Sequence, residues 1–231
     1  MEAIKNILSI CSVALLLGSC QADLLETKPY GNVAAGNMWT SENFADKGVT
    51  AIYSTLRKSY VGLGLYQMDC LGVSTDCRDA DYPIMRNTIT TSNGMFSSYW
   101  SEHYSGISRA NDAIVHLPEV DMPENKKARY MAEAKVLRAY FYYKLNIMYK
   151  GVPVYLEPVE ASECTKGQET EAAVWQVIED DLTAAINEPN LPNIYTEGSS
   201  DYGRVTKGLA YALRGKAYLL SLIHISEPTR P

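Results

Sequence analysis

The chain has 231 residues, of which 46% are hydrophobic and 21% are charged. This composition is typical of a globular protein large enough for one substantial domain. The formal net charge of −6 argues against nucleic acid as the main partner, because binding to phosphates requires clustered Lys and Arg. The three His residues show no His-x-x-x-His spacing, so we expect no zinc site, and no cofactor is expected. Calcium bound by Asp76, Asp79 and Asp81 stays an alternative to the expected absence of a metal, although the Asp-x-Asp-x-Asp-Gly pattern of a calcium loop is missing.

The amino-terminal segment has the features of an export signal. An apolar run from Ile7 to Leu17 is too short to span a bilayer but suits the core of a secretory signal. It leads into Leu17-Gly18-Ser19-Cys20, which resembles the lipobox of bacterial lipoproteins. The resemblance implies that residues 1–19 are a signal peptide and that Cys20 is acylated, which would anchor the protein to a membrane. An ordinary signal peptide cleaved near Cys20 and a buried amino-terminal helix are the alternatives.

Apolar residues at three- and four-residue spacing predict helices joined by proline-bearing loops. These helices run from about Thr40 to Tyr60, from Ser97 to Leu117, from Glu124 to Tyr149, from Glu171 to Asn187, and onward from about Thr206. Thr40 or Ser41 is the expected cap of the first helix. Convincing alternating strand patterns are missing from the sequence, so we expect an all-α fold built from helical hairpins.

A long polar segment, from Leu65 to Asn93, separates the first two helices. Long irregular segments in compact domains are often functional. Tyr82 offers an aromatic ring beside polar side chains, a combination that suits a ligand with one apolar face and a rim of hydroxyls. These predicted ligand-binding neighbours are Arg78, Asp79 and Asp81. A solvated acidic loop without a ligand is the alternative, and pairing of Cys70 with Cys77 is also left open.

The last eleven residues, 221–231, read differently from the rest. Ser221 to Arg230 resembles the in-frame translation of a transposase adapter used in DNA library preparation. We therefore expect this tail to be non-native and the native helix to continue beyond about Leu220. Such segments are excluded from functional arguments.

Several ordered blocks point to one protein family. They are Ile107–Ile114, Glu133–Leu145 followed by Tyr149–Val154, Ile178–Leu182, and Gly203–Leu213. Together they resemble the amino-terminal region of SusD/RagB-like nutrient-binding lipoproteins of Bacteroidetes, over residues 20–220. The resemblance implies an incomplete SusD-like domain of tetratricopeptide-like helix pairs on the outer membrane. There the protein would capture glycans and deliver them to a SusC-like TonB-dependent transporter.

Polar residues within these blocks suggest structural roles. Arg138 lies on the flank of a helix stripe, where its guanidinium can bridge carbonyls or carboxylates of neighbouring helices. Asn111 can cross-link helices through its amide. Gly203, followed by Arg204, allows a tight turn into a capped helix. We expect these residues to support the scaffold rather than contact a ligand. The candidate partners of Arg138 are Glu133 and Asp112.

The sequence gives no support for an enzyme. It contains no Gly-x-Ser-x-Gly elbow, no His-Glu-x-x-His and no Gly-rich phosphate loop, so no catalytic residue is expected. A glycosidase carboxylate pair cannot be placed from sequence, because its separation is spatial. A surface nutrient-binding lipoprotein is therefore the favoured function. The alternative is a tetratricopeptide-like adaptor without a small-molecule ligand.

Overall fold

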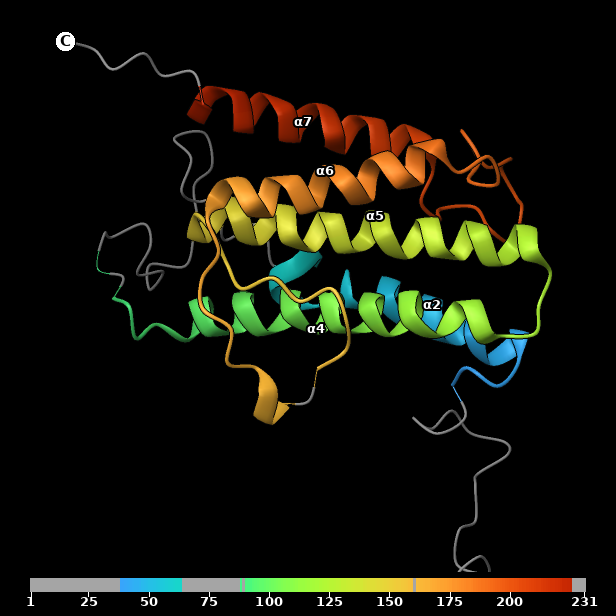
Figure 1. Cartoon of the computed structure of the whole chain (residues 1–231), viewed down its shortest axis with the longest axis horizontal. Coiled ribbons are helices and arrows are strands. Elements are labelled where there is room, and N and C mark those ends of the chain that lie inside the picture. The colour runs from blue at the N-terminus through green and yellow to red at the C-terminus, as the bar shows by residue number, and fades with distance from the viewer. Residues whose placement is uncertain (1–37, 64–87, 89, 160, 226–231) are drawn as a thin grey trace, which may run out of the picture. The chain divides into compact units, whose positions relative to one another are not determined.

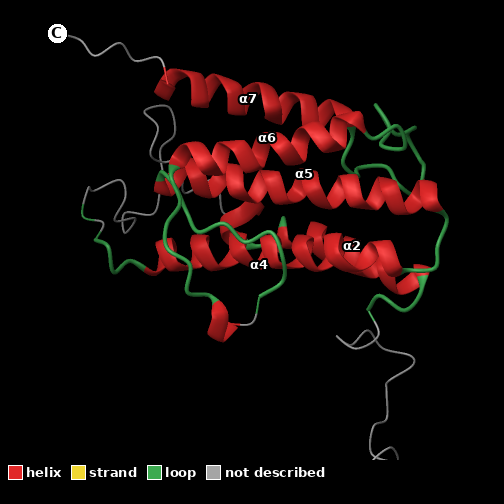
Figure 2. Cartoon of the chain, viewed as in Figure 1, coloured by secondary structure: helices red, strands yellow, loops and turns green. Residues whose placement is uncertain are grey.

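The computed structural model describes residues 38–63, 88, 90–159 and 161–225, and within these ranges it contains helices and no strands (Figure 2). The long helices are α2 (Glu42–Thr55), α4 (Gly94–His116), α5 (Glu124–Tyr149), α6 (Glu171–Asn187) and α7 (Lys207–Ile225). The short helical turns are η2 (Ser59–Leu63), η3 (Leu117–Glu119) and η4 (Ala161–Glu163). The predicted all-α class is confirmed.

Side chains that cap the first turn determine where the helices begin. The Ser41 hydroxyl accepts a hydrogen bond from the Phe44 amide (3.4 Å), as predicted for the first helix. The Asn93 side chain accepts from the Met95 amide (2.9 Å), so α4 begins three residues before the predicted start at Ser97. A cap satisfies amides that the helix itself leaves without partners, and this extends the helix toward its cap.

The first helix is shorter than predicted, because α2 ends at Thr55 rather than near Tyr60. The Leu56 amide donates to the carbonyl of Tyr53 (3.0 Å), three residues back, which tightens the last turn. The Tyr60 amide then donates to the Glu102 carboxylate of α4 (2.7 Å). This tertiary contact turns the chain out of the α-helical path that the apolar spacing alone predicted.

The helices pack in sequence order, with α2 on α4, α4 on α5, α5 on α6, and α6 on α7. Figure 1 shows α4, α5, α6 and α7 lying side by side, which is the arrangement that successive helical hairpins produce. The segment 150–170, between α5 and α6, has only the short turn η4 and crosses the face of α4 (Figure 1). This crossing builds one side of the site described below.

The core is centred on α5, which is buried on almost every side. Its buried residues include Tyr130, Ala134, Leu137, Phe141, Tyr142 and Leu145. Burial of a large apolar side chain stabilises the fold by about 1.5–3 kcal/mol. Helix α4 approaches α5 closely at Gly106, where an added Cβ would lie 2.5 Å from a ring carbon of Phe141. Glycine at this position therefore sets the distance between the two helices.

The described helices were also compared with the requirements for crossing a bilayer. Across residues 38–63, 88, 90–159 and 161–225, none has both the length and the hydropathy that a membrane span needs.

Candidate functional site

Five residues predicted to carry function lie outside the described residues. They are the lipidation candidate Cys20 and the ligand-binding candidates Arg78, Asp79, Asp81 and Tyr82. Their roles stay predictions from the sequence. The cysteines Cys70 and Cys77 lie in the same undescribed segment.

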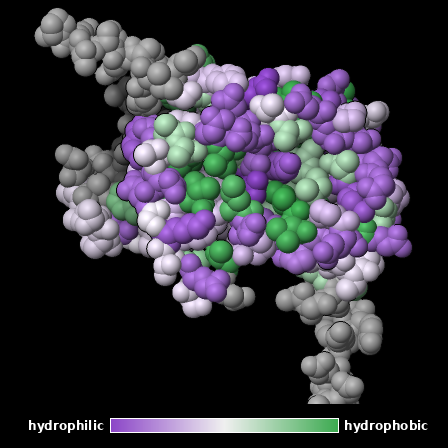
Figure 3. All heavy atoms as spheres, in the orientation of Figure 1, coloured by the Kyte–Doolittle hydropathy of each residue, from purple (hydrophilic) through white to green (hydrophobic). Residues whose placement is uncertain are grey.

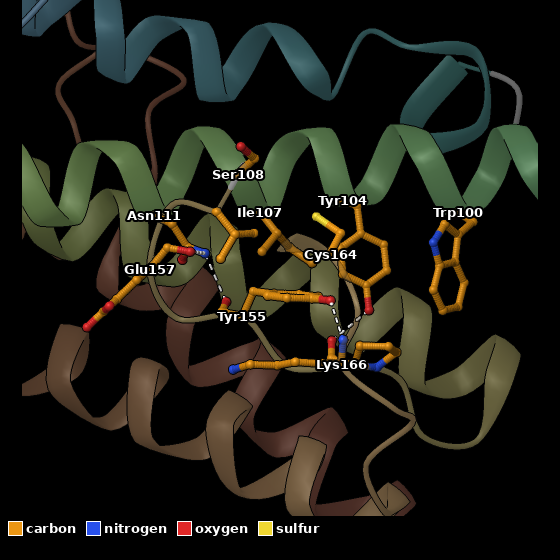
Figure 4. Close-up of a pocket in the computed structure, with 11 residues that line it drawn as sticks. Trp100, Tyr104, Ile107, Ser108, Asn111, Tyr155, Glu157, Cys164 and Lys166 are labelled. Carbon is orange, nitrogen blue, oxygen red and sulfur yellow. Dashed lines mark hydrogen bonds between the residues drawn. The ribbon is translucent and has the colours of Figure 1, made fainter. Parts of the chain in front are cut away.

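A cavity of about 370 Å³ lies between α4 and the segment 153–166. This volume falls within the range of about 300–1,000 Å³ that is usual for small-molecule sites. Residues on one face of α4 supply its first wall, because spacings of three, four and seven bring side chains to the same side of a helix. They are Trp100, Tyr104, Ile107, Ser108 and Asn111. The facing wall comes from the segment 153–166, and Figure 4 shows its Tyr155 and Lys166 opposite Tyr104.

Three aromatic rings form a connected row along the cavity. The ring centroids of Trp100 and Tyr104 are 4.8 Å apart, and those of Tyr104 and Tyr155 are 6.3 Å apart at near right angles. The Tyr104 hydroxyl donates to the carbonyl of Pro153 (2.6 Å), which ties α4 to the facing wall. Burial, and then the nearby Tyr142 and Tyr155, raise the pKa of Tyr104 above its usual value. The Tyr104 hydroxyl therefore stays protonated and uncharged.

Polar groups stand at both ends of this row. Glu157 and Trp100 lie at opposite ends in Figure 4, and the Glu157 side chain is exposed. Among the described residues, none accepts a hydrogen bond from the indole N–H of Trp100. The Lys166 ammonium lies 5.2 Å from the Tyr155 ring centroid and donates to the carbonyl of Val154 (3.0 Å). The cavity thus offers stacking surfaces together with a donor, an acceptor and a cation.

Apolar side chains are exposed beside the cavity. Val159, which lines it, exposes 39% of its surface, and Leu156, which lies three residues earlier on the adjoining surface, exposes 45%. Figure 3 shows hydrophobic side chains gathered in the middle of the face that the segment 150–170 crosses in Figure 1. Apolar surface with a few polar groups is typical of ligand sites. No group of three or more His, Cys, Asp or Glu side chains within the described ranges is placed to hold a metal ion.

Arg138 makes the kind of helix bridge that the sequence predicts, but with another partner. Its guanidinium forms two 2.7 Å hydrogen bonds with the buried carboxylate of Asp181 on α6 and donates to the Asn111 side chain on α4 (2.8 Å). Asn111 therefore does cross-link helices. The predicted partners Glu133 and Asp112 are wrong. Glu133 stands five residues before Arg138, roughly 140° around α5, and Asp112 accepts a hydrogen bond from Trp39 instead (2.9 Å).

Glu133 is fully buried and belongs to a second charged cluster that fixes the loop 188–206. Its carboxylate accepts from Tyr53 (2.7 Å) and from Arg204 (3.0 Å). Burial raises the pKa of Glu133, and the adjacent Arg204 guanidinium opposes this rise. Gly203 has φ +93°, as expected of a tight turn before α7. Neither Gly203 nor Arg204 lines the cavity, so their contacts support the predicted scaffold role.

A model of the SusD-like family, described as "Starch-binding associating with outer membrane", matches residues 24–219. The chain belongs to the SusD-like family. SusD-like protein P38 of Formosa agariphila is 28% identical over 211 residues, which are 87% of this chain and 40% of the relative. The chain thus spans about two fifths of the length of that SusD-like relative.

Solved SusD-like structures share the fold. One, a "Laminarin binding SusD-like protein", is 35% identical with a TM-score of 0.68, over 79% of this chain and 41% of that protein. Another, surface glycan-binding protein A from Bacteroides uniformis, is 27% identical with a TM-score of 0.69, over 80% and 43%. The predicted family and its tetratricopeptide-like helical arrangement are thereby confirmed.

The cavity of this SusD-like chain was missed by sequence reasoning. Trp100 and Tyr104 lie on the apolar side of the helix predicted from Ser97 to Leu117, and both are only partly buried and line the cavity. Tyr155 lies 51 residues and Lys166 lies 62 residues beyond Tyr104 in the chain, and nothing local in the sequence brings them to α4. One signal in the sequence could have indicated that this side of the helix faces solvent. It is the pair of large aromatic residues Trp100 and Tyr104, four positions apart and followed by the polar Ser108.

Proposed function

We propose that this chain is part of a cell-surface glycan-binding lipoprotein, which captures oligosaccharides and passes them to a SusC-like TonB-dependent transporter in the outer membrane. The family description and the laminarin- and glycan-binding names of related proteins support this proposal. The observation that carries it is the aromatic row of Trp100, Tyr104 and Tyr155 along a cavity of about 370 Å³.

The cavity chemistry suits a sugar. A pyranose has an apolar face of C–H groups and a rim of hydroxyls, so it needs an aromatic platform and hydrogen-bonding groups at its edge. Trp100 supplies a ring whose indole N–H donates to no described residue. Ser108 supplies an exposed hydroxyl, and Glu157 supplies an exposed carboxylate that accepts from sugar hydroxyls.

The charges around the cavity favour a neutral glycan. Among the described lining residues the only cation is Lys166, and its ammonium already donates to the Val154 carbonyl. Sulfate and carboxylate groups are best bound by the planar fork of arginine, and the described lining contains none. Glu157 adds a negative charge that repels polyanions. We therefore propose laminarin-like or starch-like neutral chains as ligands rather than sulfated or uronic-acid polymers.

Binding without cleavage is part of the proposal. Glycoside hydrolysis normally uses two carboxyl groups that flank the scissile bond, roughly 5–9.5 Å apart. Among the described lining residues, Glu157 is the only acidic side chain. The cavity can hold a glycan but offers no acid–base pair to break it.

Attachment and a second ligand contact are also proposed from the sequence. Cys20 would carry the acyl chains that hold the domain of residues 20–220 on the outer face of the membrane, after removal of residues 1–19. The segment with Arg78, Asp79, Asp81 and Tyr82 would add further contacts to the glycan. Metabolic labelling with a clickable fatty acid should label the wild type and not Cys20→Ser.

Titration calorimetry against laminarin, soluble starch and alginate tests the proposal. We expect laminarin or starch to bind, alginate not to bind, and no reducing ends to be released. Trp100→Leu keeps apolar packing but removes the stacking ring, so affinity should fall at least about tenfold, or about 1.4 kcal/mol. Tyr202→Ala, an exposed tyrosine outside the cavity, is the control and should bind normally.

Other outcomes would redirect the proposal. A loss of binding in Tyr82→Ala but not in Trp100→Leu would place the site in the segment from Leu65 to Asn93. If the wild type binds none of the glycans, the adaptor would be the remaining function. Release of reducing ends would indicate an enzyme.

A further inference from the structure

The cavity wall opposite α4 is a stretch of chain without helix, residues 153–159, which bends at Glu157. Its odd-numbered residues line the cavity, which is the period-two alternation of a β-strand. They are Pro153, Tyr155, Glu157 and Val159. Val154 and Leu156 do not line the cavity but border a second groove of about 610 Å³ beside Ala173 and Val177 of α6, which Tyr155, Glu157 and Val159 border as well. The alternation fixes which side chains a ligand in the cavity meets.

No described residue pairs with this stretch as a neighbouring strand, so its backbone must find other partners. Buried side chains provide them at three consecutive carbonyls. The Tyr155 carbonyl accepts from the Asn111 amide (2.9 Å) and from the Tyr142 hydroxyl (2.8 Å). The Leu156 carbonyl accepts from Arg138 (3.1 Å), and the Glu157 carbonyl accepts from Asn111 (3.2 Å).

These side chains are themselves held firmly. Arg138 is fixed by its paired hydrogen bonds to Asp181, and the Tyr142 hydroxyl also accepts from the Tyr155 amide (2.8 Å). Tyr142 is fully buried, and Arg138 is exposed by only 6%. Neither lines the cavity. Asn111 does line it, but both of its amide hydrogens are directed to the wall.

We infer that Asn111, Tyr142 and Arg138 are positioning residues, which hold the wall 155–157 in register so that Tyr155 and Glu157 face a bound glycan. This inference rests on the proposed function. Pre-organised groups bind more tightly because no freedom is lost when the ligand arrives. A wall released from the contacts at these three carbonyls would let Tyr155 leave the aromatic row and would weaken binding, and in a Tyr142 variant this would happen without any change in a cavity-lining side chain.

Tyr142→Phe isolates this role, since it removes one hydroxyl and keeps the buried ring. Tyr99→Phe is the matched control, because Tyr99 is also buried and its hydroxyl donates to a carbonyl away from the wall, that of Lys144 (3.2 Å). Asn111→Asp is the second variant. It keeps an acceptor for Arg138 but removes both donors to the wall.

The experiment measures hydrogen–deuterium exchange of the amides of residues 154–157 and 159 in the free protein. It also measures calorimetric affinity for laminarin, or for soluble starch if the wild type binds only starch. Tyr142→Phe and Asn111→Asp should exchange faster in the wall and bind at least about threefold more weakly. Tyr99→Phe should change neither the exchange of the wall amides nor the affinity, although its melting temperature should be similar to that of Tyr142→Phe.

Normal affinity in Tyr142→Phe would overturn the inference and leave the proposed function intact, even if Asn111→Asp bound more weakly, because Asn111 itself lines the cavity. An equal loss in Tyr99→Phe would overturn it too. If the wild type binds neither glycan, the proposed function fails and the positioning role fails with it.

Discussion

The close approach of α4 to α5 is tested by adding a single methyl group at Gly106. A Cβ there would lie 2.5, 2.6 and 2.8 Å from three ring carbons of Phe141, and that ring is fully buried. Alanine gains about 1 kcal/mol over glycine in a helix interior, whereas overpacking a well-filled core costs about 1–3 kcal/mol and sometimes more. We expect Gly106→Ala to lower the free energy of unfolding by up to about 2 kcal/mol, or the melting temperature by up to roughly 8 °C.

The same substitution at Gly215 is the control. Gly215 lies inside α7, and nothing stands within 4 Å of an added Cβ. Here only the propensity gain of up to about 1 kcal/mol remains, so Gly215→Ala should stabilise the protein. Urea unfolding followed by far-UV circular dichroism measures both variants. A stabilised Gly106→Ala, or equal shifts in the two variants, would refute the close contact between α4 and α5.

Two further predictions concern buried ionisable side chains. Burial lowers the pKa of His103 to about 4. Between pH 6.5 and pH 4 this imidazole is therefore protonated in the unfolded chain and neutral in the folded chain. The free energy of unfolding should therefore fall by up to about 3 kcal/mol between pH 6.5 and pH 4. Urea unfolding at pH 7, 5.5 and 4.5 should show that this free energy depends less steeply on pH in His103→Leu than in the wild type. An equally steep pH dependence in the variant would contradict the burial of His103. Asp181→Asn leaves the Arg138 guanidinium buried without its counter-charge and should destabilise by about 3–5 kcal/mol in the same assay. Glu124→Gln removes an exposed carboxylate that pairs with Lys127 in the first turn of α5 and should cost about 1 kcal/mol or less. Equal effects of the two substitutions would show that the Arg138 pair is not buried.

Local physics made most of the helices predictable. Apolar spacing and a hydroxyl at Ser41 were enough to place α2, and Pro123 correctly marked the start of α5. The end of α2 was not predictable, because the Tyr60 amide is captured by Glu102, a residue 42 positions away. Boundaries that depend on tertiary hydrogen bonds leave no local signal in the sequence.

The candidate site was harder to predict for the same reason. The Tyr104 hydroxyl meets the Pro153 carbonyl across 49 residues, and the wall contacts of Asn111 cross 44 and 46 residues. Sequence reasoning could identify Arg138 as a bridging residue but could not select Asp181, since the direction around α5 decides the partner. The geometry of the fold, rather than any motif, brings the cavity together.

The indole N–H signals offer the most direct test of the cavity as the glycan site. The chain has three tryptophans, and the indoles of Trp39 and Trp175 donate to Asp112 and Glu171. In a ¹H–¹⁵N spectrum titrated with laminarin or starch oligosaccharides, the Trp100 signal, assigned through Trp100→Phe, should shift while the other two stay in place. Saturable binding that leaves the Trp100 signal unmoved would contradict the account.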